Sequence, residues 1–251
     1  MKISAVLITQ NEEKNLPDCL AGLHFCDELI LVDSGSQDGT VSLARSLGAK
    51  VFSNPFLDFA SQKNFGIRQA ACDWVFLIDA DERVSEALAA EIRAALEKPD
   101  AEGYFVRRIN RLFGRWMHYG ANGQDRQLRL VQKEKALFQG KVHERIYLNG
   151  ATRCLKNPLM HHSTPTIKNY MRKLNVYTSL EADGLADRHA DLSENKLKKR
   201  PLGLFFYLYF IRLGFLDGLE GFLFNGLSAY YEFVRYAKHW ELASTNKGKG
   251  V

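Results

Sequence analysis

Two aspartates, Asp79 and Asp81, form an Asp-Ala-Asp sequence directly after the apolar run at residues 74–78. Carboxylates at the end of a buried strand repel each other, and a divalent cation relieves that repulsion. Hard oxygen ligands favour Mg²⁺ or Mn²⁺, and two carboxylates with a diphosphate match the usual binding of such ions. The alternative is that aspartates at strand ends serve as turn formers and helix caps. A single Asp-x-Asp sequence is common by chance, so the residues around it must decide between a metal site and a turn.

Polar residues also follow two earlier apolar runs. Thr9, Asn11 and Glu12 come after residues 3–8, and Asp33 opens the polar stretch 33–39 after residues 28–32. Ligands of an open parallel sheet bind beyond the carboxyl ends of its strands, so these residues are expected at one edge with the aspartate pair. A dinucleotide site is less favoured, because no Gly-x-Gly-x-x-Gly follows the first run.

The spacing of apolar residues predicts the elements that carry these positions. Strands are expected at 3–8, 28–32, 50–53 and 74–78, with helical patterns between them, including one at 59–71. Such alternation predicts a parallel sheet. A further helix is expected after Ser85, a good N-cap. Residues 104–160 predict a mixed, partly antiparallel extension, and 167–185 predict a helix.

The basic charge of the chain lies at its C-terminal end. The net charge is +5, and residues 196–251 hold nine Lys or Arg against four Asp or Glu. This asymmetry indicates a local anionic partner, either a membrane surface or a nucleic acid. The N-terminus predicts a first strand and no signal peptide. The four cysteines show no metal-binding or disulfide pattern, which suits a reducing cytoplasm.

The apolar C-terminal part predicts amphipathic helices at a membrane surface. Its first apolar run is broken by Arg212 and is too short to span a bilayer. Lys196, Lys198, Lys199 and Arg200 precede these helices, a pattern typical of an interfacial anchor on anionic lipid. The alternative is that the helices cap the catalytic core or pair in a dimer. We expect a catalytic domain at 1–186, and a linker at 187–199 followed by helices within 187–251.

Four segments together resemble the family 2 glycosyltransferases, which have the GT-A fold: SAVLITQNEEKNL, ELILVDSGSQDGT, FASQKN and WVFLIDADERV. The resemblance implies a Rossmann-like mixed α/β sheet with flanking helices. It also implies that Thr9, Asn11 and Glu12 help to hold a nucleotide and that Asp33 contacts uracil. By the same resemblance Lys63 lies near the donor phosphates, Asp79 serves the donor, and Asp81 is the direct metal ligand.

The second half narrows the resemblance to bacterial lipopolysaccharide core β-1,4-glucosyltransferases. It is carried by DRQLRLV, KVHERI and NPLMHHST. It implies UDP-glucose as donor, an inner-core heptose as acceptor, and His161 as a second metal ligand. His162 departs from the pattern, since that subfamily often has an aromatic residue there. The alternative for His161 is a capped or core histidine.

Inverting transfer needs a carboxylate that deprotonates the acceptor hydroxyl while the nucleotide diphosphate leaves on the opposite side. Asp125 and Glu144 are the candidates, and Asp125 is favoured. Asp125 could instead form an ion pair with Arg126 or Arg129, and Glu144 one with Arg145 or Lys141.

Two other functions fit parts of the sequence. The first is a family 2 transferase whose acceptor is a peptide, a polyprenyl phosphate or a capsule sugar. The second is a basic nucleic-acid-binding protein, which explains the basic end but not the polar residues after the strands. We therefore expect a cytoplasmic enzyme, peripherally associated with the inner membrane, with no nucleic-acid partner.

Overall fold

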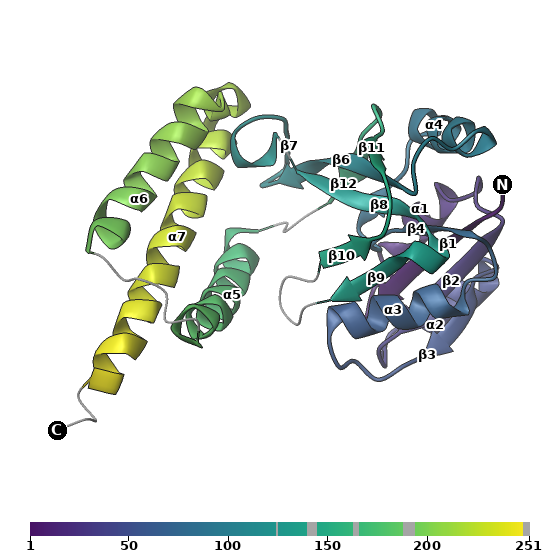
Figure 1. The fold of residues 1–251 in the computed structure, drawn as a ribbon, viewed down its shortest axis with the longest axis horizontal. Coiled ribbons are helices and arrows are strands. Elements are labelled where there is room, and N and C mark those ends of the chain that lie inside the picture. Colours follow the sequence, from purple (N-terminus) through teal and green to yellow (C-terminus); the bar gives the residue numbers. More distant parts are fainter. Residues whose placement is uncertain (124, 140–144, 163–165, 188–193, 248–251) are drawn as a thin grey trace. The chain divides into compact units, whose positions relative to one another are not determined.

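The computed structural model describes residues 1–123, 125–139, 145–162, 166–187 and 194–247 (Figure 1). The chain forms two compact units. The first contains residues 1–109 and 125–161, and the second contains residues 110–124 and 162–251. The chain therefore leaves the first unit after Ile109, returns at Asp125, and leaves again after His161.

A mixed sheet forms the centre of the first unit. Four parallel strands lie in the order β3-β2-β1-β4. Strand β8 continues the sheet antiparallel to β4, and β6 pairs with β8 antiparallel, so that β6 again runs in the direction of the first four strands. The strands of this part are β1 (Ile3–Thr9), β2 (Glu28–Asp33), β3 (Lys50–Ser53), β4 (Trp74–Leu77), β6 (Gly103–Leu112) and β8 (Arg126–Gln132). The short strands are β5 (Glu82–Arg83), β7 (Arg115–Met117), β9 (Ala136–Gln139), β10 (Arg145–Leu148), β11 (Thr152–Cys154) and β12 (Leu159–His161).

Helices cover both faces of the sheet because its inner strands are apolar on both sides. Three helices pack on one face, with buried residues such as Leu16, Ala44 and Ile92 meeting Leu7 and Phe76. These are α1 (Leu16–Ala21), α2 (Thr40–Ser46) and α4 (Glu86–Glu97). The opposite face is covered by α3 (Phe59–Gln69) and the β9–β10 hairpin.

The predicted elements of the first unit are confirmed to within a few residues. All four parallel strands occur at the predicted positions, and α4 begins after Ser85, whose Oγ accepts from Leu88 N at 3.2 Å. The spacing of Val41, Ala44 and Leu47 predicts that all three share one buried helical face, but Leu47 is 42% exposed. It lies just after the end of α2, where the helical periodicity no longer applies.

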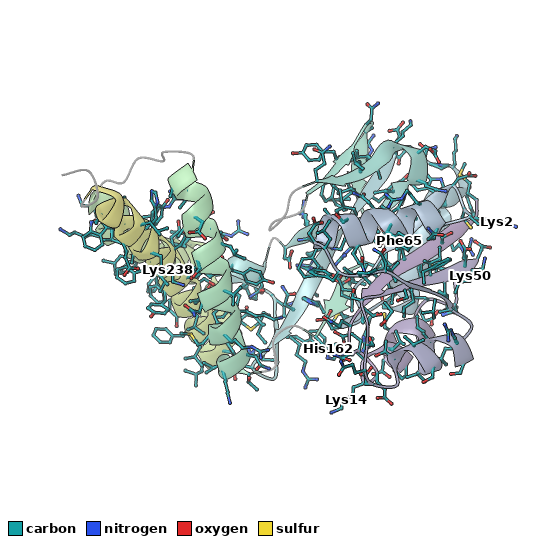
Figure 2. All side chains as sticks on the ribbon, turned by 90° about the horizontal axis from the view of Figure 1, so that it is seen from below. Lys2, Lys14, Lys50, Phe65, His162 and Lys238 are labelled. Atoms are coloured by element: carbon teal, nitrogen blue, oxygen red, sulfur yellow. The ribbon has the colours of Figure 1, made fainter. Side chains whose placement is uncertain are left out.

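The second unit combines an excursion of the sheet with the C-terminal helices. Residues 110–124 carry β7 and the single turn η1 (Gly120–Asn122). The helices are α5 (Ile167–Asp187), α6 (Glu194–Phe206), the π-helical turn η3 (Tyr207–Ile211), η4 (Gly214–Asp217) and α7 (Gly218–Lys247). Lys238 of α7 joins α5 by donating to Asn175 O at 2.7 Å and to Thr178 Oγ1 at 2.9 Å (Figure 2).

The described part of the predicted linker is helical. Residues 194–199 belong to α6, and Asp187 ends α5. The segment is polar, but its lysines, leucine and glutamate are good helix formers, and α6 packs along α7. The compact units also divide the chain at other points than residue 186, since α5 belongs to the second unit. Whether residues 1–186 hold the catalytic function stays a prediction.

Over the described residues, no single helix has both the length and the apolar composition to cross a membrane. One pair, Leu197–Ile211 with Gly214–Ser244, meets both criteria only together, and it is bent by 74°.

Candidate active site

The loops after β1 and β2 are joined by hydrogen bonds through residues predicted to hold the nucleotide. Asn11 N donates to Ser36 Oγ at 2.8 Å, and Asn11 Oδ1 accepts from Gln37 N at 2.8 Å. Asn11 has a left-handed backbone with φ of 58°, a conformation that Asn tolerates better than most residues. Glu12 N donates to Thr40 Oγ1 at 2.8 Å. The two loops therefore form one preshaped edge beyond the parallel strands.

Asp33 shapes the second of these loops from within. It is 3% exposed, and its Oδ2 accepts from Gly35 N and Ser36 N, both at 2.9 Å. Gly35 has φ of 89°, which favours glycine. Thr9 Oγ1 donates to Asp33 Oδ1 at 3.5 Å. Thr9 and Asp33 therefore lie side by side as predicted, while the contact of Asp33 with uracil stays a prediction.

Helix α3 supports this edge through two amide side chains. Gln62 is fully buried and its Nε2 donates to Ser34 Oγ at 2.7 Å, which fixes the loop after β2. Asn64 pairs with the backbone of Phe138 in β9, at 2.8 and 2.9 Å. Between them, Lys63 places its Nζ 5.3 Å from the centre of the Phe138 ring. The FASQKN segment thus contains two structural amides around the predicted phosphate-facing lysine.

Asp79, the first aspartate of the Asp-Ala-Asp sequence, belongs to a network of charged side chains with the buried residues Glu82 and Arg129. Arg129 Nη2 contacts Asp79 Oδ2 at 2.7 Å and also contacts Glu82 Oε1. Glu82 is fully buried, and its Oε2 accepts from Asp79 N at 3.0 Å. Burial raises the pKa of Glu82, with Arg129 opposing that shift. Burial would also raise the pKa of Asp79, but Arg129 and Lys63 hold it below its usual range.

Asp125 joins the same network through Arg108. Arg108 Nε and Nη2 both contact Asp125 Oδ2 at 2.9 Å, and Arg108 Nη1 contacts Glu82 Oε1 at 3.3 Å. Asp125 Oδ1 accepts from Gln127 Nε2 at 2.9 Å. Asp125 therefore does form an ion pair, but its partner is Arg108 rather than Arg126 or Arg129. Arg108 thereby links the favoured base candidate to Glu82, and the role of Asp125 as the base stays a prediction.

Asp81 and His161 meet although they are far apart in the sequence. Strand β5 follows the acidic pair immediately and runs antiparallel to β12, with His161 opposite Glu82. His161 Nε2 lies 3.3 Å from Asp81 Oδ2. The Asp81 side chain is 33% exposed and the His161 side chain 13% exposed. Both predicted metal ligands are therefore adjacent, and Asp81 remains open to solvent.

The donor atoms of this pair fit a divalent cation that also binds phosphate. Among the described residues, no group of three His, Cys, Asp or Glu side chains is close enough to hold a metal alone. Mg²⁺ is commonly held by one or two protein ligands together with substrate phosphates. Two neighbouring ligands of an octahedral ion lie about 3 Å apart, close to the observed 3.3 Å.

Three residues of this charge network were given no role from the sequence, and a fourth residue, a base candidate, lies outside the described residues. Glu82 and Arg108 connect Asp125 to Arg129 and Asp79. Glu82 stands within the WVFLIDADERV segment, whereas Arg108 belongs to no motif quoted above. Arg129 did carry a signal, since it is a charged residue within the apolar strand β8 and is 5% exposed. A buried charge of this kind requires a partner of opposite sign. Glu144, the second base candidate, lies outside the described residues.

We expect Arg129→Met to destabilise the protein by about 3–5 kcal/mol, because it leaves Glu82 buried without its main cation. The penalty should decrease as the pH falls, since protonation of Glu82 removes the buried charge. Urea unfolding at several pH values measures both effects. Arg126→Met, at an exposed position of the same strand, is the control and should change stability by no more than about 0.5 kcal/mol. Equal effects of the two variants would contradict the buried network.

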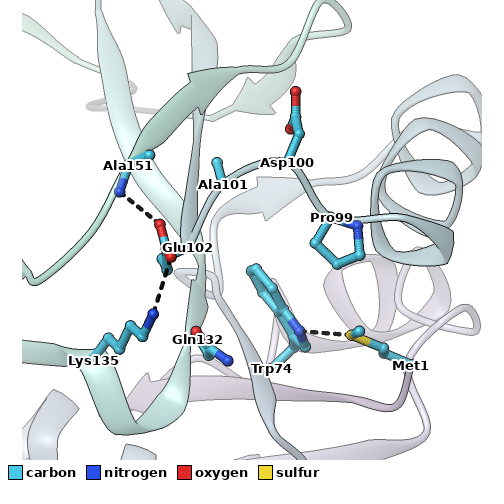
Figure 3. Close-up of a pocket in the computed structure, with 9 residues that line it drawn as sticks. All are labelled: Met1, Trp74, Pro99, Asp100, Ala101, Glu102, Gln132, Lys135 and Ala151. Atoms are coloured by element: carbon cyan, nitrogen blue, oxygen red, sulfur yellow. Dashed lines mark hydrogen bonds and ion pairs between the residues drawn. The ribbon is translucent and has the colours of Figure 1, made fainter.

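A separate cavity of about 520 Å³ lies at the opposite edge of the sheet (Figure 3). Met1 and Trp74 line it, and Trp74 Nε1 donates to Met1 Sδ at 3.1 Å. These residues precede or begin β1 and β4, so the cavity adjoins the amino ends of the parallel strands. Ligands of such sheets bind at the carboxyl ends, where the acidic pair lies.

Several proteins similar to this chain over nearly its full length are glycosyltransferases. The model of glycosyl transferase family 2 matches residues 4–175. An uncharacterized glycosyltransferase of Rickettsia felis is 33% identical, with 100% of this chain and 93% of the relative covered. The lipopolysaccharide core biosynthesis glycosyltransferase LpsC of Rhizobium meliloti is 32% identical, with 96% of this chain and 93% of the relative covered.

Among solved structures, S. aureus TarS 1-349 in complex with UDP-GlcNAc has a TM-score of 0.50 at 16% identity. It covers 94% of this chain and 81% of that chain, a likeness that concerns the fold. The mixed sheet, its flanking helices and the C-terminal helices agree with the predicted GT-A architecture. Because the family model covers most of the chain and the relatives match over nearly its full length, this chain is a GT-A glycosyltransferase of family 2.

Proposed function

We propose that this transferase moves glucose from UDP-glucose to an inner-core heptose of lipopolysaccharide, with inversion at the anomeric carbon. One observation supports the donor part of this proposal. The loops around Asn11 and Asp33 lie at the same edge of the sheet as the Asp81–His161 pair. The acceptor class is supported by the near full-length similarity to LpsC.

The chemistry divides among the residues of this edge. Asp81 and His161 would hold Mg²⁺ or Mn²⁺, which neutralises negative charge on the leaving diphosphate. Lys63 contributes a further positive charge on the phosphate side. Arg129 is committed to Asp79 and Glu82, so it orients the acidic residues and does not serve the phosphates.

Asp125 is the proposed base. It takes the proton of the acceptor hydroxyl while that oxygen forms a bond to the anomeric carbon, and UDP leaves from the opposite side with the bonding electrons. Arg108 orients Asp125 by two contacts at 2.9 Å.

A donor and acceptor screen tests this function. The protein is incubated with UDP-glucose, UDP-galactose, UDP-N-acetylglucosamine or GDP-mannose, with and without Mn²⁺, and nucleotide release is measured. We expect release from UDP-glucose that requires the metal and increases with lipopolysaccharide truncated to its inner core. Stimulation instead by a peptide, a polyprenyl phosphate or a capsule sugar would replace the proposed acceptor.

We further propose that the enzyme acts at the cytoplasmic face of the inner membrane, held there by its C-terminal unit. Around the bend between α6 and α7, apolar side chains face solvent: Leu202 is 66% exposed, Phe206 59%, Ile211 71% and Leu219 68%. Lys198 and Lys199 are exposed on the same segment. Apolar and aromatic side chains beside cations suit the interface of an anionic bilayer. Arg200 contributes less, because it pairs with Glu232 at 2.7 Å.

We expect the double variant Phe206→Asp, Ile211→Asp to release the protein from vesicles that contain anionic phosphatidylglycerol. Charge reversal at Lys198 and Lys199 should weaken binding by about 1 kcal/mol per residue at low salt. Vesicle flotation measures both. Leu57→Asp is the matched control, since Leu57 is 80% exposed in the first unit. A wild-type protein that ignores anionic vesicles at low salt would contradict the proposal.

A further inference from the structure

The connection between β6 and β8 is held by the C-terminal helices through its backbone. His118 N and Tyr119 N donate to the carboxylate of Asp217, at 3.1 and 2.9 Å. Gly120 N donates to Arg212 O at 2.9 Å. Ala121 N donates to Asn225 Oδ1 at 3.1 Å. Four consecutive backbone N–H groups of this loop thus donate hydrogen bonds to residues at or near the bend between α6 and α7.

The groups that receive these bonds are buried and closely packed. Asp217 is 2% exposed and Asn225 is 1% exposed. Asn225 Nδ2 also donates to Gly221 O at 2.7 Å, which fixes the orientation of the amide. Gly120 has φ of 61°, and a Cβ at this position would overlap the Asn225 side chain. A side chain at position 120 would therefore disturb the packing of the loop against Asn225.

The bend that presents Asp217 is itself strained. Leu213 has a left-handed backbone with φ of 58°, which is uncommon for a bulky side chain. Residues held in such conformations persist only where the surrounding structure requires them. The strain is explained if the bend is shaped to receive the loop rather than only to connect two helices.

The loop matters because it leads directly into the proposed base. It occupies residues 113–123, and Asp125 is the residue immediately before β8. Within the first unit, Arg108 holds the Asp125 side chain, and Arg108 N donates to Asp125 O at 2.8 Å. Within the second unit, Asp217 and Asn225 hold the backbone of the loop that comes before Asp125 in the sequence. The loop also carries Tyr119, 38% exposed, and the exposed His118.

We infer that Asp217 and Asn225 are positioning residues for acceptor use: they seat the loop that precedes Asp125 in the chain. This inference rests on the proposed function. It also gives the helices a task besides membrane association. Deleting residues 201–251 would remove both side chains, so a truncated enzyme cannot separate the two roles.

The test uses the full-length protein with Asp217→Ala and the milder Asp217→Asn. Hydrogen–deuterium exchange reports the loop, titration with UDP-glucose and Mn²⁺ reports the donor site, and kinetics with truncated lipopolysaccharide report the acceptor. Two orphaned N–H groups should lower acceptor kcat/KM by about tenfold or more, with faster exchange confined to the loop. Donor affinity should stay within about twofold. Asp217→Asn retains one oxygen that can accept a hydrogen bond, so its kcat/KM should lie between those of the wild type and Asp217→Ala. This variant provides the test if Asp217→Ala does not fold.

Glu220→Gln is the matched control, because Glu220 lies nearby and makes only a 3.7 Å surface pair with Arg115. Unchanged loop exchange, or unchanged acceptor kinetics despite a loosened loop, would overturn the inference. A parallel loss of donor affinity would also overturn it, since that indicates general unfolding. A wild-type protein that binds no UDP-sugar would instead contradict the proposed function, and exchange would still decide whether Asp217 seats the loop.

Discussion

Replacement of Asp81 by alanine is expected to abolish transfer while leaving the fold intact. The Asp81 side chain is one-third exposed and contacts His161, so its removal leaves no buried carboxylate or cation without its partner. The proposed cation would lose its carboxylate ligand, and the diphosphate would lose the charge that stabilises it as it leaves. We expect a fall in kcat of at least about 1,000-fold, in the range found when electrostatic stabilisation of a leaving or developing anion is removed.

Three comparisons separate this role from a structural one. His161→Ala should shift the Mn²⁺ dependence of activity more than the unfolding midpoint. Asp79→Ala should behave differently from Asp81→Ala, because Asp79 pairs with the buried Arg129 and its loss should lower stability. Full activity of Asp81→Ala, or of the wild type in excess EDTA, would rule out a metal at this position.

The parallel part of the sheet could be predicted because its sequence signals are local and agree with one another. Each apolar run of four to seven residues is followed by a helical pattern, and only a parallel arrangement accommodates that order. The polar ends of β1, β2 and β4 then necessarily share an edge. Leu47 continues the helical spacing but lies just past the end of α2, because the spacing of apolar residues does not mark where a helix ends.

The charge network could be predicted only in part, because its members come from strands that pair late in the chain. Asp79 and Asp81 are visible as a motif, but Glu82 becomes important only when β8 places Arg129 against it. Arg108 lies on β6, and Asp125 lies just before β8. The two meet because β6 and β8 are antiparallel neighbours. The alternation of apolar residues shows which face of a strand is buried. The side chains that meet across two strands depend on the register of their pairing, which this alternation does not show.

The role of the C-terminal helices could likewise be predicted from the sequence only in part. Their exposed apolar residues and lysines are visible in the sequence and suggested a membrane surface. The bonds from His118 to Ala121 are made by backbone N–H groups, which every residue except proline has. No residue type therefore marks that loop as a partner of Asp217. The four glycines at 114, 120, 214 and 221 are the nearest sequence signal, and they have other common explanations.

Asp125→Asn is expected to lower kcat by about 100-fold or more at nearly unchanged donor affinity. Asparagine keeps the shape of the side chain and can still accept from Arg108, but it cannot take the acceptor proton. Glu144→Gln is the matched control from the other base candidate. If Asp125 serves only to pair with Arg108, then Asp125→Asn should resemble Arg108→Gln, with reduced stability and near-normal kcat. If both carboxylate variants retain near-normal kcat, the base lies elsewhere and the acceptor does not bind beside Asp125.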